Sequence, residues 1–339
     1  MHMKTRTRRL AALLLAGGLL LSLASCKADE KETKAGQTAL TVNGQEVAAG
    51  EYASNYLYSK LVMEQMMAQY GLSDPWEGDA ADAYKEQVAE QALQSTELLY
   101  IIPAQFEAAG LELTEDEKAG IENANLPGLA ELGFTAELAE RLARCSIMIQ
   151  RLDEHYFGEG GIMSPEESEI EDYFQQHYYR AKHILVSSRD EAGQPIEDEA
   201  ELAKLEQKAQ ELAQRAAAGE DFDTLVREYG EDPGMSANPD GYQFTDGEMV
   251  AEFQNATAAL AENAISAPVR SDFGWHIIQR LPLQPEGRAE AHGAIVTALT
   301  GMDMDRLMKQ WIAEADIQKA PLFAEITFDT VESYRYETE

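Results

Sequence analysis

Two of the six histidines in this chain stand in nearly the same sequence setting. His183 lies in AKHILV (181–186) and His276 in GWHIIQR (274–280), and each directly precedes aliphatic residues typical of a buried β-strand. A neutral imidazole carries one hydrogen-bond donor and one acceptor, so two histidines on adjacent strands could bond to each other and orient polar neighbours. The alternative is a core histidine at each position, with satisfied hydrogen bonds and no chemical role.

The elements around the two histidines decide whether the rings can meet. Alternation along a strand puts His183 and Leu185 on one face, and Ile184 and Val186 on the other. The pattern from residue 178 to 283 predicts an α+β domain, in which helices pack around a small antiparallel sheet. The expected elements are a strand at 180–188, helices at 201–219 and 221–229, a loop at 231–241, a strand at 242–244, a helix at 248–260, and strands at 265–269 and 275–281.

The residues before this domain have a mostly helical pattern. ALTVNGQEV (39–47) alternates around Asn43-Gly44 and predicts a β-hairpin. Met and Tyr stripes on the helices that follow are either core or a surface for client polypeptides, since Met-rich surfaces suit promiscuous binding. The expected helices and helix starts are 51–71, 82–102 ending before Pro103, a capping box at Thr114 and Glu117, 135–157, and a start at Ser164-Pro165-Glu166-Glu167.

The last segment, 284–339, predicts a helix at 304–315 and a strand at 324–331. This is too little to bury a core alone, so we expect the segment to return to the N-terminal part. The middle domain would then be an insertion. The predicted parts are a signal peptide (1–25), a flexible tether (26–38), a helical N-terminal domain (39–177), the α+β domain (178–283) and the returning tail (284–339).

The N-terminus has the composition of an export signal. Four basic residues precede the apolar run LAALLLAGGLLLSLAS. This run is shorter than the about 20 apolar residues that a transmembrane helix needs. The run ends in Leu23-Ala24-Ser25-Cys26, which resembles the lipobox of bacterial lipoproteins, where cleavage precedes a Cys that takes lipid. The alternative is an ordinary secreted protein with an incidental Cys26. The other cysteine, Cys145, lies in an apolar helical pattern and reads as a small core residue.

Composition excludes several functions. With 61 acidic and 27 basic residues the net charge is −34, which argues against nucleic acid or anionic lipid as a partner. The acidity serves solubility or a preference for basic clients. No H-E-x-x-H, Cys-x-x-Cys or G-x-S-x-G motif occurs, and NPDGYQFTDGE lacks the EF-hand spacing, so we expect neither a metal nor another cofactor.

Residues 180–282 resemble a parvulin-type peptidyl-prolyl cis–trans isomerase domain. The resemblance rests on AKHILV, EYGEDPG, GEMVAEF and ISAPVRSDFGWHIIQRL, in this order along the domain. The layout of signal, helical chaperone-like part, parvulin domain and C-terminal helix is similar to that of the extracytoplasmic PrsA and SurA foldases. The lipobox favours the lipid-anchored PrsA-like members, which would place the protein on the outer side of a bacterial cell membrane.

The resemblance implies a set of site residues. The polar, catalytic set would be His183, Asp232, Ser271 and His276. Met249 and Phe253 would hold the proline ring, and Cys26 would carry the lipid. Three departures from the family pattern bear on substrate preference: Pro239-Asp240-Gly241 replaces the usual Gly-Gly, Val250 replaces a polar residue, and Phe273 replaces a small one.

The resemblance also implies the function and the partners. The protein would be a peptidyl-prolyl isomerase and foldase for unfolded exported polypeptides that contain Xaa-Pro bonds, and it could form a homodimer. The alternative is a holdase-type chaperone lipoprotein whose parvulin domain is inactive. The intact set of site residues favours the isomerase.

Overall fold

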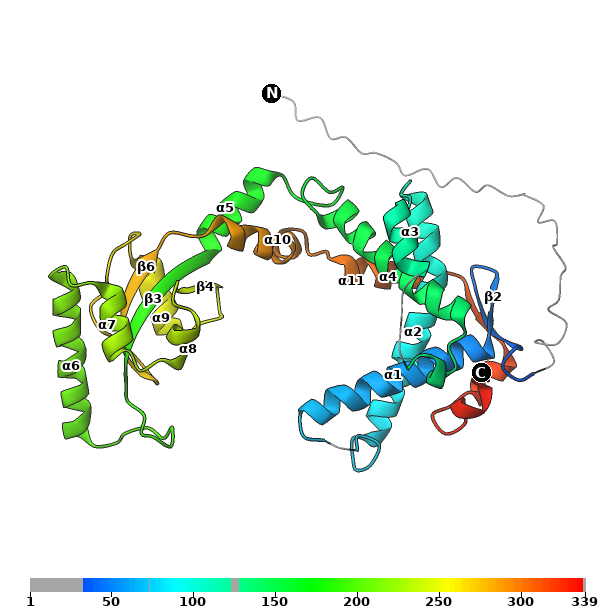
Figure 1. Cartoon of the computed structure of the whole chain (residues 1–339), viewed down its shortest axis with the longest axis horizontal. Coiled ribbons are helices and arrows are strands. Elements are labelled where there is room, and N and C mark those ends of the chain that lie inside the picture. Colours follow the sequence, from blue (N-terminus) through cyan, green and yellow to red (C-terminus); the bar gives the residue numbers. More distant parts are fainter. Residues whose placement is uncertain (1–32, 73, 123–127, 338–339) are drawn as a thin grey trace, which may run out of the picture. The chain divides into compact units, whose positions relative to one another are not determined.

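A computed structural model describes residues 33–72, 74–122 and 128–337 of the chain. Cys26 and the predicted signal segment lie outside these residues. The contacts within the chain divide it into two compact units (Figure 1). Unit 1 contains the residues up to Ile101, residues 120–143 and the residues from Ala315 onwards, and unit 2 contains Ile102–Ala119 and Arg144–Glu314.

Unit 1 contains a three-stranded antiparallel sheet with the strand order β2-β1-β7. Its strands are β1 (Thr38–Val42), β2 (Gln45–Ala48) and β7 (Ile317–Lys319). The predicted hairpin is confirmed: Asn43 and Gly44 form its turn with φ of 49° and 78°, the left-handed conformation that a two-residue hairpin turn requires. The Asn43 side chain accepts a hydrogen bond from the Asp316 N–H (2.9 Å), which fixes the tail strand beside the hairpin.

The predicted tail strand at 324–331 is wrong. The tail pairs with β1 earlier, through β7, and then forms two short 3-10 helices, η3 (Pro321–Glu325) and η4 (Val331–Tyr334). Pro321 lacks an N–H and stands at the start of η3, which favours a turn over a continued strand at this point. Val331 and Tyr334 are buried, so the tail contributes apolar side chains to unit 1.

The long helices begin as predicted, but one ends later. These are α1 (Ala49–Gln69), α2 (Ala81–Ala108) and α4 (Ala136–Phe157). The expected end before Pro103 is wrong, because α2 runs on to Ala108 with the proline inside it. An internal proline costs about 3 kcal/mol, and burial of Ile101, Ile102 and Phe106 on both sides of it offsets that cost.

Further helices lie outside the predicted α+β domain. Unit 2 contains α5 (Glu167–His177), α10 (Pro285–Thr300) and α11 (Met304–Glu314), together with the first part of α3 (Glu115–Glu122). The Thr114/Glu117 capping box is confirmed, since Glu117 Oε2 accepts from the Thr114 N–H (2.7 Å) and Thr114 Oγ1 from the Glu117 N–H (3.2 Å). The cap expected at Ser164 is wrong: α5 begins two residues later than proposed, where the Glu169 carboxylate accepts from the Glu166 N–H. Cys145 is buried, as expected of a core residue.

Unit 2 also contains the α+β domain. Its elements are β3 (Tyr178–Ser187), α6 (Glu199–Ala217), α7 (Phe222–Tyr229), α8 (Pro233–Ala237), β4 (Tyr242–Thr245), α9 (Ala251–Ala259), β5 (Val269–Ser271) and β6 (Gly274–Leu281). The strand order is β4-β3-β6-β5 and every neighbouring pair is antiparallel, which confirms the predicted α+β class (Figure 1).

Three details of this domain differ from the sequence prediction. The helix expected at 248–260 begins at Ala251, so Met249 precedes it. The expected loop at 231–241 contains the short helix α8, because the Asp232 carboxylate caps the Gly234 N–H (3.0 Å) and Pro233 suits the first helical position. The strand expected at 265–269 lies at Val269–Ser271, and residue 265 makes only an isolated bridge to Gln279.

The two faces of the sheet bury different residues. Ile184 and Val186 belong to a cluster with residues of α6 and α7, while Ala181 and Ile278 belong to another with Phe253 of α9. The central strands β3 and β6 are therefore covered on both sides, which holds their side chains in fixed orientations.

Candidate active site

The two histidines meet on the central strands of the sheet. In the β3–β6 register Leu185 lies opposite His276 and His183 opposite Ile278, so both imidazoles project from the same face. The Nδ1 atoms of His183 and His276 are 3.0 Å apart and the rings are stacked with their centroids 5.1 Å apart. Both side chains are buried, with 5% and 4% of their surface exposed.

Two polar side chains extend this pair at either end. Asp232, the cap of α8, places its Oδ2 2.8 Å from His183 Nε2. Ser271, at the end of β5, places its Oγ 2.7 Å from His276 Nε2 and accepts from the Phe273 N–H at 3.1 Å. The four residues that the resemblance singled out therefore form one continuous hydrogen-bonded row, which we call the histidine row: Asp232, His183, His276 and Ser271.

With both imidazoles neutral, an ionised Asp232 fixes the direction of every proton in the histidine row. The carboxylate can only accept, so His183 carries its hydrogen on Nε2 and leaves Nδ1 as an acceptor. His276 then donates from Nδ1 and accepts the Ser271 hydroxyl at Nε2. The row thus has a single polarity, and reversing it requires a change at Asp232.

Electrostatics favour a carboxylate at Asp232 and a neutral imidazole at His276. The hydrogen bond from His183, together with those from Tyr242 and the Gly234 N–H, lowers the pKa of Asp232 from its usual 3.8 to about 2. Burial lowers the pKa of His276 from 6.5 to about 4, because the imidazolium form would lose its hydration. At neutral pH the structure therefore holds a carboxylate at one end of the row and a neutral His276 inside it.

A cavity of about 440 Å³ opens beside the histidine row. Phe253 is buried and stands with its ring edge-on to His183 and His276, at centroid distances of 5.1 and 5.5 Å. Both predicted ring-binding residues, Met249 and Phe253, line the cavity, as do three members of the histidine row. The full lining is His183, Leu185, Asp232, Tyr242, Glu248, Met249, Val250, Phe253, Phe273 and His276. The cavity is an apolar recess with a polar edge, the usual form of a small ligand site.

Tyr242 is a site residue that the sequence analysis missed. Its hydroxyl donates to Asp232 Oδ2 at 2.7 Å, and its ring lies 6.1 Å from that of His183. The hydroxyl passes so close to Gly234 that a Cβ there would lie 1.9 Å from it, so only glycine leaves room for this hydrogen bond. The strand YQF carried the available signal: Tyr242 and Phe244 alternate onto one face, and Phe244 is buried.

Two of the three departures from the family pattern, Val250 and Phe273, also line the cavity. Val250 precedes α9, and Phe273 lies at the β5–β6 turn with 44% of its surface exposed. The Arg189 guanidinium lies over the Phe273 ring, 4.9 Å from its centroid. The rim of the cavity is therefore aromatic and partly cationic on one side, and it carries the Glu248 and Asp232 carboxylates elsewhere.

A comparison with protein families matches residues 183–281 to the rotamase family, described as the PPIC-type PPIase domain. Residues 183–281 form a parvulin domain. The match begins at the first histidine of the histidine row and ends with strand β6, so it covers the whole row and the cavity.

Relatives of known name extend the similarity beyond the parvulin domain. The chain is 26% identical over 330 residues to the foldase protein PrsA of Caldanaerobacter subterraneus, covering 94% of this chain and 97% of that protein. It is 44% identical over 101 residues to the chaperone SurA of Alkalilimnicola ehrlichii, covering 30% of this chain and 22% of that protein. The similarity to the foldase thus covers nearly the full length, and the similarity to the chaperone covers a segment the size of the parvulin domain.

Solved structures were also matched. A crystal structure of the peptidylprolyl isomerase PrsA from Bacillus anthracis is 19% identical, with a TM-score of 0.31, and covers 66% of this chain and 96% of that one. A solution structure of TbPIN1 is 29% identical, with a TM-score of 0.27, and covers 31% of this chain and 97% of that one. At these TM-scores the assignment rests on the sequence matches alone.

Proposed function

We propose that this protein is a peptidyl-prolyl cis–trans isomerase that assists the folding of exported polypeptides. The observation that carries the proposal is the histidine row running along the edge of an apolar cavity that Phe253 and Met249 line. The isomerase domain matched in residues 183–281 and the near full-length similarity to a PrsA foldase support it.

The geometry suits a reaction without a covalent step. Rotation about an Xaa-Pro bond breaks amide resonance, with a barrier of roughly 20 kcal/mol, and takes tens of seconds without catalysis. The site must bind the twisted amide better than either planar form. Phe253 and Met249 hold the proline ring and exclude water, which strengthens electrostatic interactions at the adjacent polar edge. His183 and His276 orient that edge, and Asp232 and Ser271 fix their tautomers.

Client binding belongs to unit 1 in this proposal. Of the Tyr and Met side chains of α1, Tyr52, Tyr56 and Met63 are buried and serve as core. The C-terminal part of α1 and the residue that follows it nevertheless expose large apolar side chains at helical spacing: Tyr58, Leu61, Val62, Met66 and Tyr70. An exposed apolar stripe of this kind suits the apolar segments of an unfolded chain.

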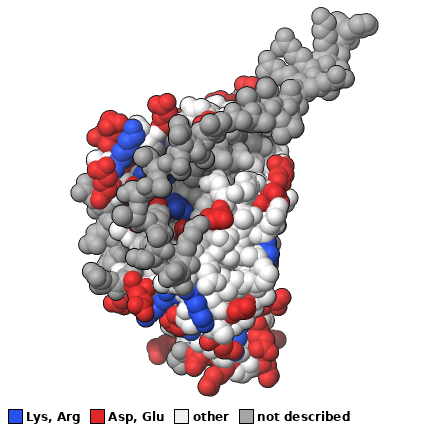
Figure 2. Space-filling model, turned by 90° about the vertical axis from the view of Figure 1, so that its right-hand side faces the viewer, with Lys and Arg blue, Asp and Glu red and all other residues white. Residues whose placement is uncertain are grey.

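The surface charge fits clients that are not acidic. On the face shown in Figure 2, red acidic side chains outnumber blue basic ones and surround an uncharged area. This agrees with the net charge of −34. Acidic polypeptides would be repelled, while apolar and basic segments would not.

The lipid anchor is part of the proposal. Cys26 ends the apolar signal run at a lipobox-like sequence, so we propose that it becomes the lipidated N-terminus of an extracytoplasmic protein. No helix in the described ranges is long and apolar enough to cross a membrane. Cys26→Ala should release the protein from the membrane fraction, and a variant that sediments with membranes like the wild type would contradict this part.

The domain boundaries are likewise proposed. Residues 178–283 contain the complete four-stranded sheet with its covering helices, so this segment should fold when excised. Because the tail strand β7 pairs with β1, truncation at 283 should destabilise the N-terminal part. Thermal unfolding of the two fragments tests both statements, and an N-terminal fragment that is equally stable without the tail would refute the insertion.

The isomerase activity is tested with the full chain on a short Xaa-Pro peptide, by exchange spectroscopy between its cis and trans signals. The matched variant is Phe253→Leu, which keeps an apolar side chain but removes the ring beside both histidines. Suppression of aggregation of an unfolded protein is measured in parallel. We expect catalysed exchange to be strongly slowed in the variant and suppression of aggregation to persist.

A further inference from the structure

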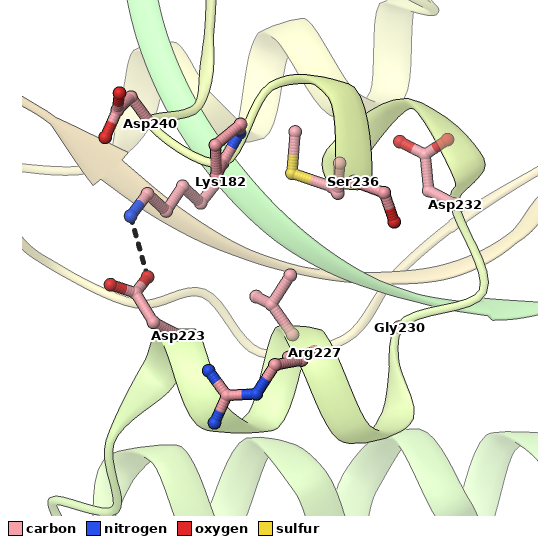
Figure 3. Close-up of a pocket in the computed structure, with 10 residues that line it drawn as sticks. Lys182, Asp223, Arg227, Gly230, Asp232, Ser236 and Asp240 are labelled. Carbon is pink, nitrogen blue, oxygen red and sulfur yellow. Dashed lines mark hydrogen bonds and ion pairs between the residues drawn. The ribbon is translucent and has the colours of Figure 1, made fainter.

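We call the cavity beside the histidine row the proline site. A second cavity of about 540 Å³ shares Asp232 with it (Figure 3). It lies between strand β3, helix α7 and the segment around α8, and its lining residues are Lys182, Asp223, Val226, Arg227, Gly230, Asp232, Met235, Ser236, Pro239 and Asp240. We call it the flanking groove. Asp232 lines both cavities, so a polypeptide whose proline occupies the first can extend past this carboxylate into the second.

The flanking groove has an apolar floor and a charged rim. Val226 and Met235 supply apolar surface, and Met235 is buried. The rim carries Lys182 and Arg227 together with the carboxylates of Asp223 and Asp240. In the view of Figure 3, Asp223 and Asp240 stand at the end of the groove where the Lys182 side chain lies, and Asp232 stands at the other end. A long side chain with an apolar stem and a charged head fits such a groove.

The lining of the groove carries three carboxylates, those of Asp223, Asp232 and Asp240, against two cations, Lys182 and Arg227. Lys182 forms an ion pair with Asp223, with 2.7 Å between Nζ and Oδ1. Arg227 donates to Thr224 Oγ1 of its own helix and lies near Asp221, whose pKa it helps to lower. Asp240 accepts a hydrogen bond through its main-chain carbonyl from Arg180, but within the described ranges its carboxylate forms no ion pair. Asp240 therefore offers a carboxylate without an ion-pair partner in the described ranges, and Asp232 adds a second carboxylate toward the proline site.

We propose that the flanking groove is a substrate subsite that binds a lysine or arginine side chain of the client polypeptide, close in sequence to the isomerised proline. The apolar floor takes the methylene stem, and Asp240 takes the cationic head. Because the two cavities share Asp232, the basic residue lies close in sequence to the proline. This inference rests on the proposed isomerase function and adds a substrate class to it.

The experiment uses the full-length protein and peptides with one proline and one variable residue. The variable residue is lysine, norleucine or glutamate, placed in turn at each of the three positions before and after the proline. Norleucine keeps the apolar stem and lacks the charge. The catalysed exchange rate gives kcat/KM, and the amide signals of Gly230 and Ser236 in ¹⁵N-labelled protein report occupancy of the groove independently of catalysis.

At one position, lysine should exceed norleucine by about twofold to fivefold in kcat/KM, the range expected for an ion pair that is exposed to solvent. Glutamate should fall below norleucine at the same position. Asp240→Asn should make kcat/KM equal for the lysine and norleucine peptides. Arg227→Gln removes a positive charge from the rim and should therefore increase the difference between the two kcat/KM values. Asp246→Asn, which removes the same charge from an exposed pair with His177, is the matched control and should leave the preference unchanged. Raising the salt concentration should shrink the preference.

The outcomes separate this inference from the proposed function. If wild type isomerises the peptides but no position distinguishes lysine from norleucine, the subsite is refuted and the isomerase stands. If no peptide is isomerised, the proposed isomerase function is refuted. The amide signals then test the subsite by themselves. Charge-dependent shifts of Gly230 and Ser236 that Asp240→Asn abolishes would still establish the subsite, and their absence would overturn it.

Discussion

Asp232→Asn should reverse the polarity of the histidine row. The carboxylate uses Oδ1 to cap the Gly234 N–H and Oδ2 to accept from His183 and Tyr242. If asparagine keeps its oxygen at the cap, its NH₂ group faces His183 Nε2 and can only donate. His183 must then carry its hydrogen on Nδ1 and donate to His276, which in turn must donate from Nε2 to Ser271.

The cost of this change follows from the pKa of Asp232. Its depression from 3.8 to about 2 corresponds to an upper bound of about 2.5 kcal/mol at neutral pH, at ~1.4 kcal/mol for each pKa unit. The side chain is 22% exposed, so solvent screens part of this. We therefore expect Asp232→Asn to lower the free energy of unfolding by about 1–2 kcal/mol and kcat/KM by about tenfold to a hundredfold.

Three measurements check this prediction. Urea unfolding gives the stability, peptide exchange gives kcat/KM, and the ¹⁵N shifts of the imidazoles report which ring nitrogen carries the hydrogen. Asp246→Asn is the matched control, because the exposed His177–Asp246 pair has a similar N–O distance of 2.7 Å and should contribute less than 1 kcal/mol. Unchanged tautomers together with full activity in Asp232→Asn would refute the proton directions assigned here.

The remaining predictions concern the ring, the hydroxyl and pH. Phe253→Leu should cost about 1 kcal/mol of stability and at least about tenfold in kcat/KM, whereas Phe222→Leu, in the other core cluster, should cost similar stability and no activity. Tyr242→Phe removes a donor to the carboxylate and so raises the pKa of Asp232, and the acid limb of the pH–rate profile should move to higher pH; an unmoved limb would contradict this. Because the pKa of His276 is about 4 when folded and 6.5 when unfolded, the unfolded chain binds more protons between these values. The free energy of unfolding should therefore fall by up to about 3 kcal/mol as pH drops from 6.5 to 4. In His276→Gln, urea unfolding at the same pH values should show a fall that is smaller by this amount.

The sequence predicted the elements that local patterns determine. The strand alternation around His183, the Asn43-Gly44 turn and the Thr114 cap each depend on a few neighbouring residues, and each appears in the structure. The meeting of the two imidazoles required one more assumption, that their strands are adjacent, and the family resemblance supplied it.

The errors arose where tertiary contacts override local rules. Pro103 normally ends a helix, but the buried residues around it keep α2 continuous. Helix α10 was not predicted at all. Its Arg288 bonds to Glu167 and approaches Glu159 and Glu171, partners that are distant in sequence. Tyr242 was missed because its alternation with Phe244 predicts only the face of the strand on which it lies, whereas its role depends on Asp232 and on the space left by Gly234.

The central claim is that the parvulin domain is a working isomerase, and the cis–trans exchange rate of a short Xaa-Pro peptide in the presence of the full chain tests it most directly. At a catalytic concentration of protein, exchange that takes tens of seconds unaided should occur within a second or less. The acceleration should fall at least about tenfold in Phe253→Leu, as the loss of the ring from the proline site requires. Exchange at the uncatalysed rate with every peptide tried, in a protein that still suppresses aggregation, would contradict the claim.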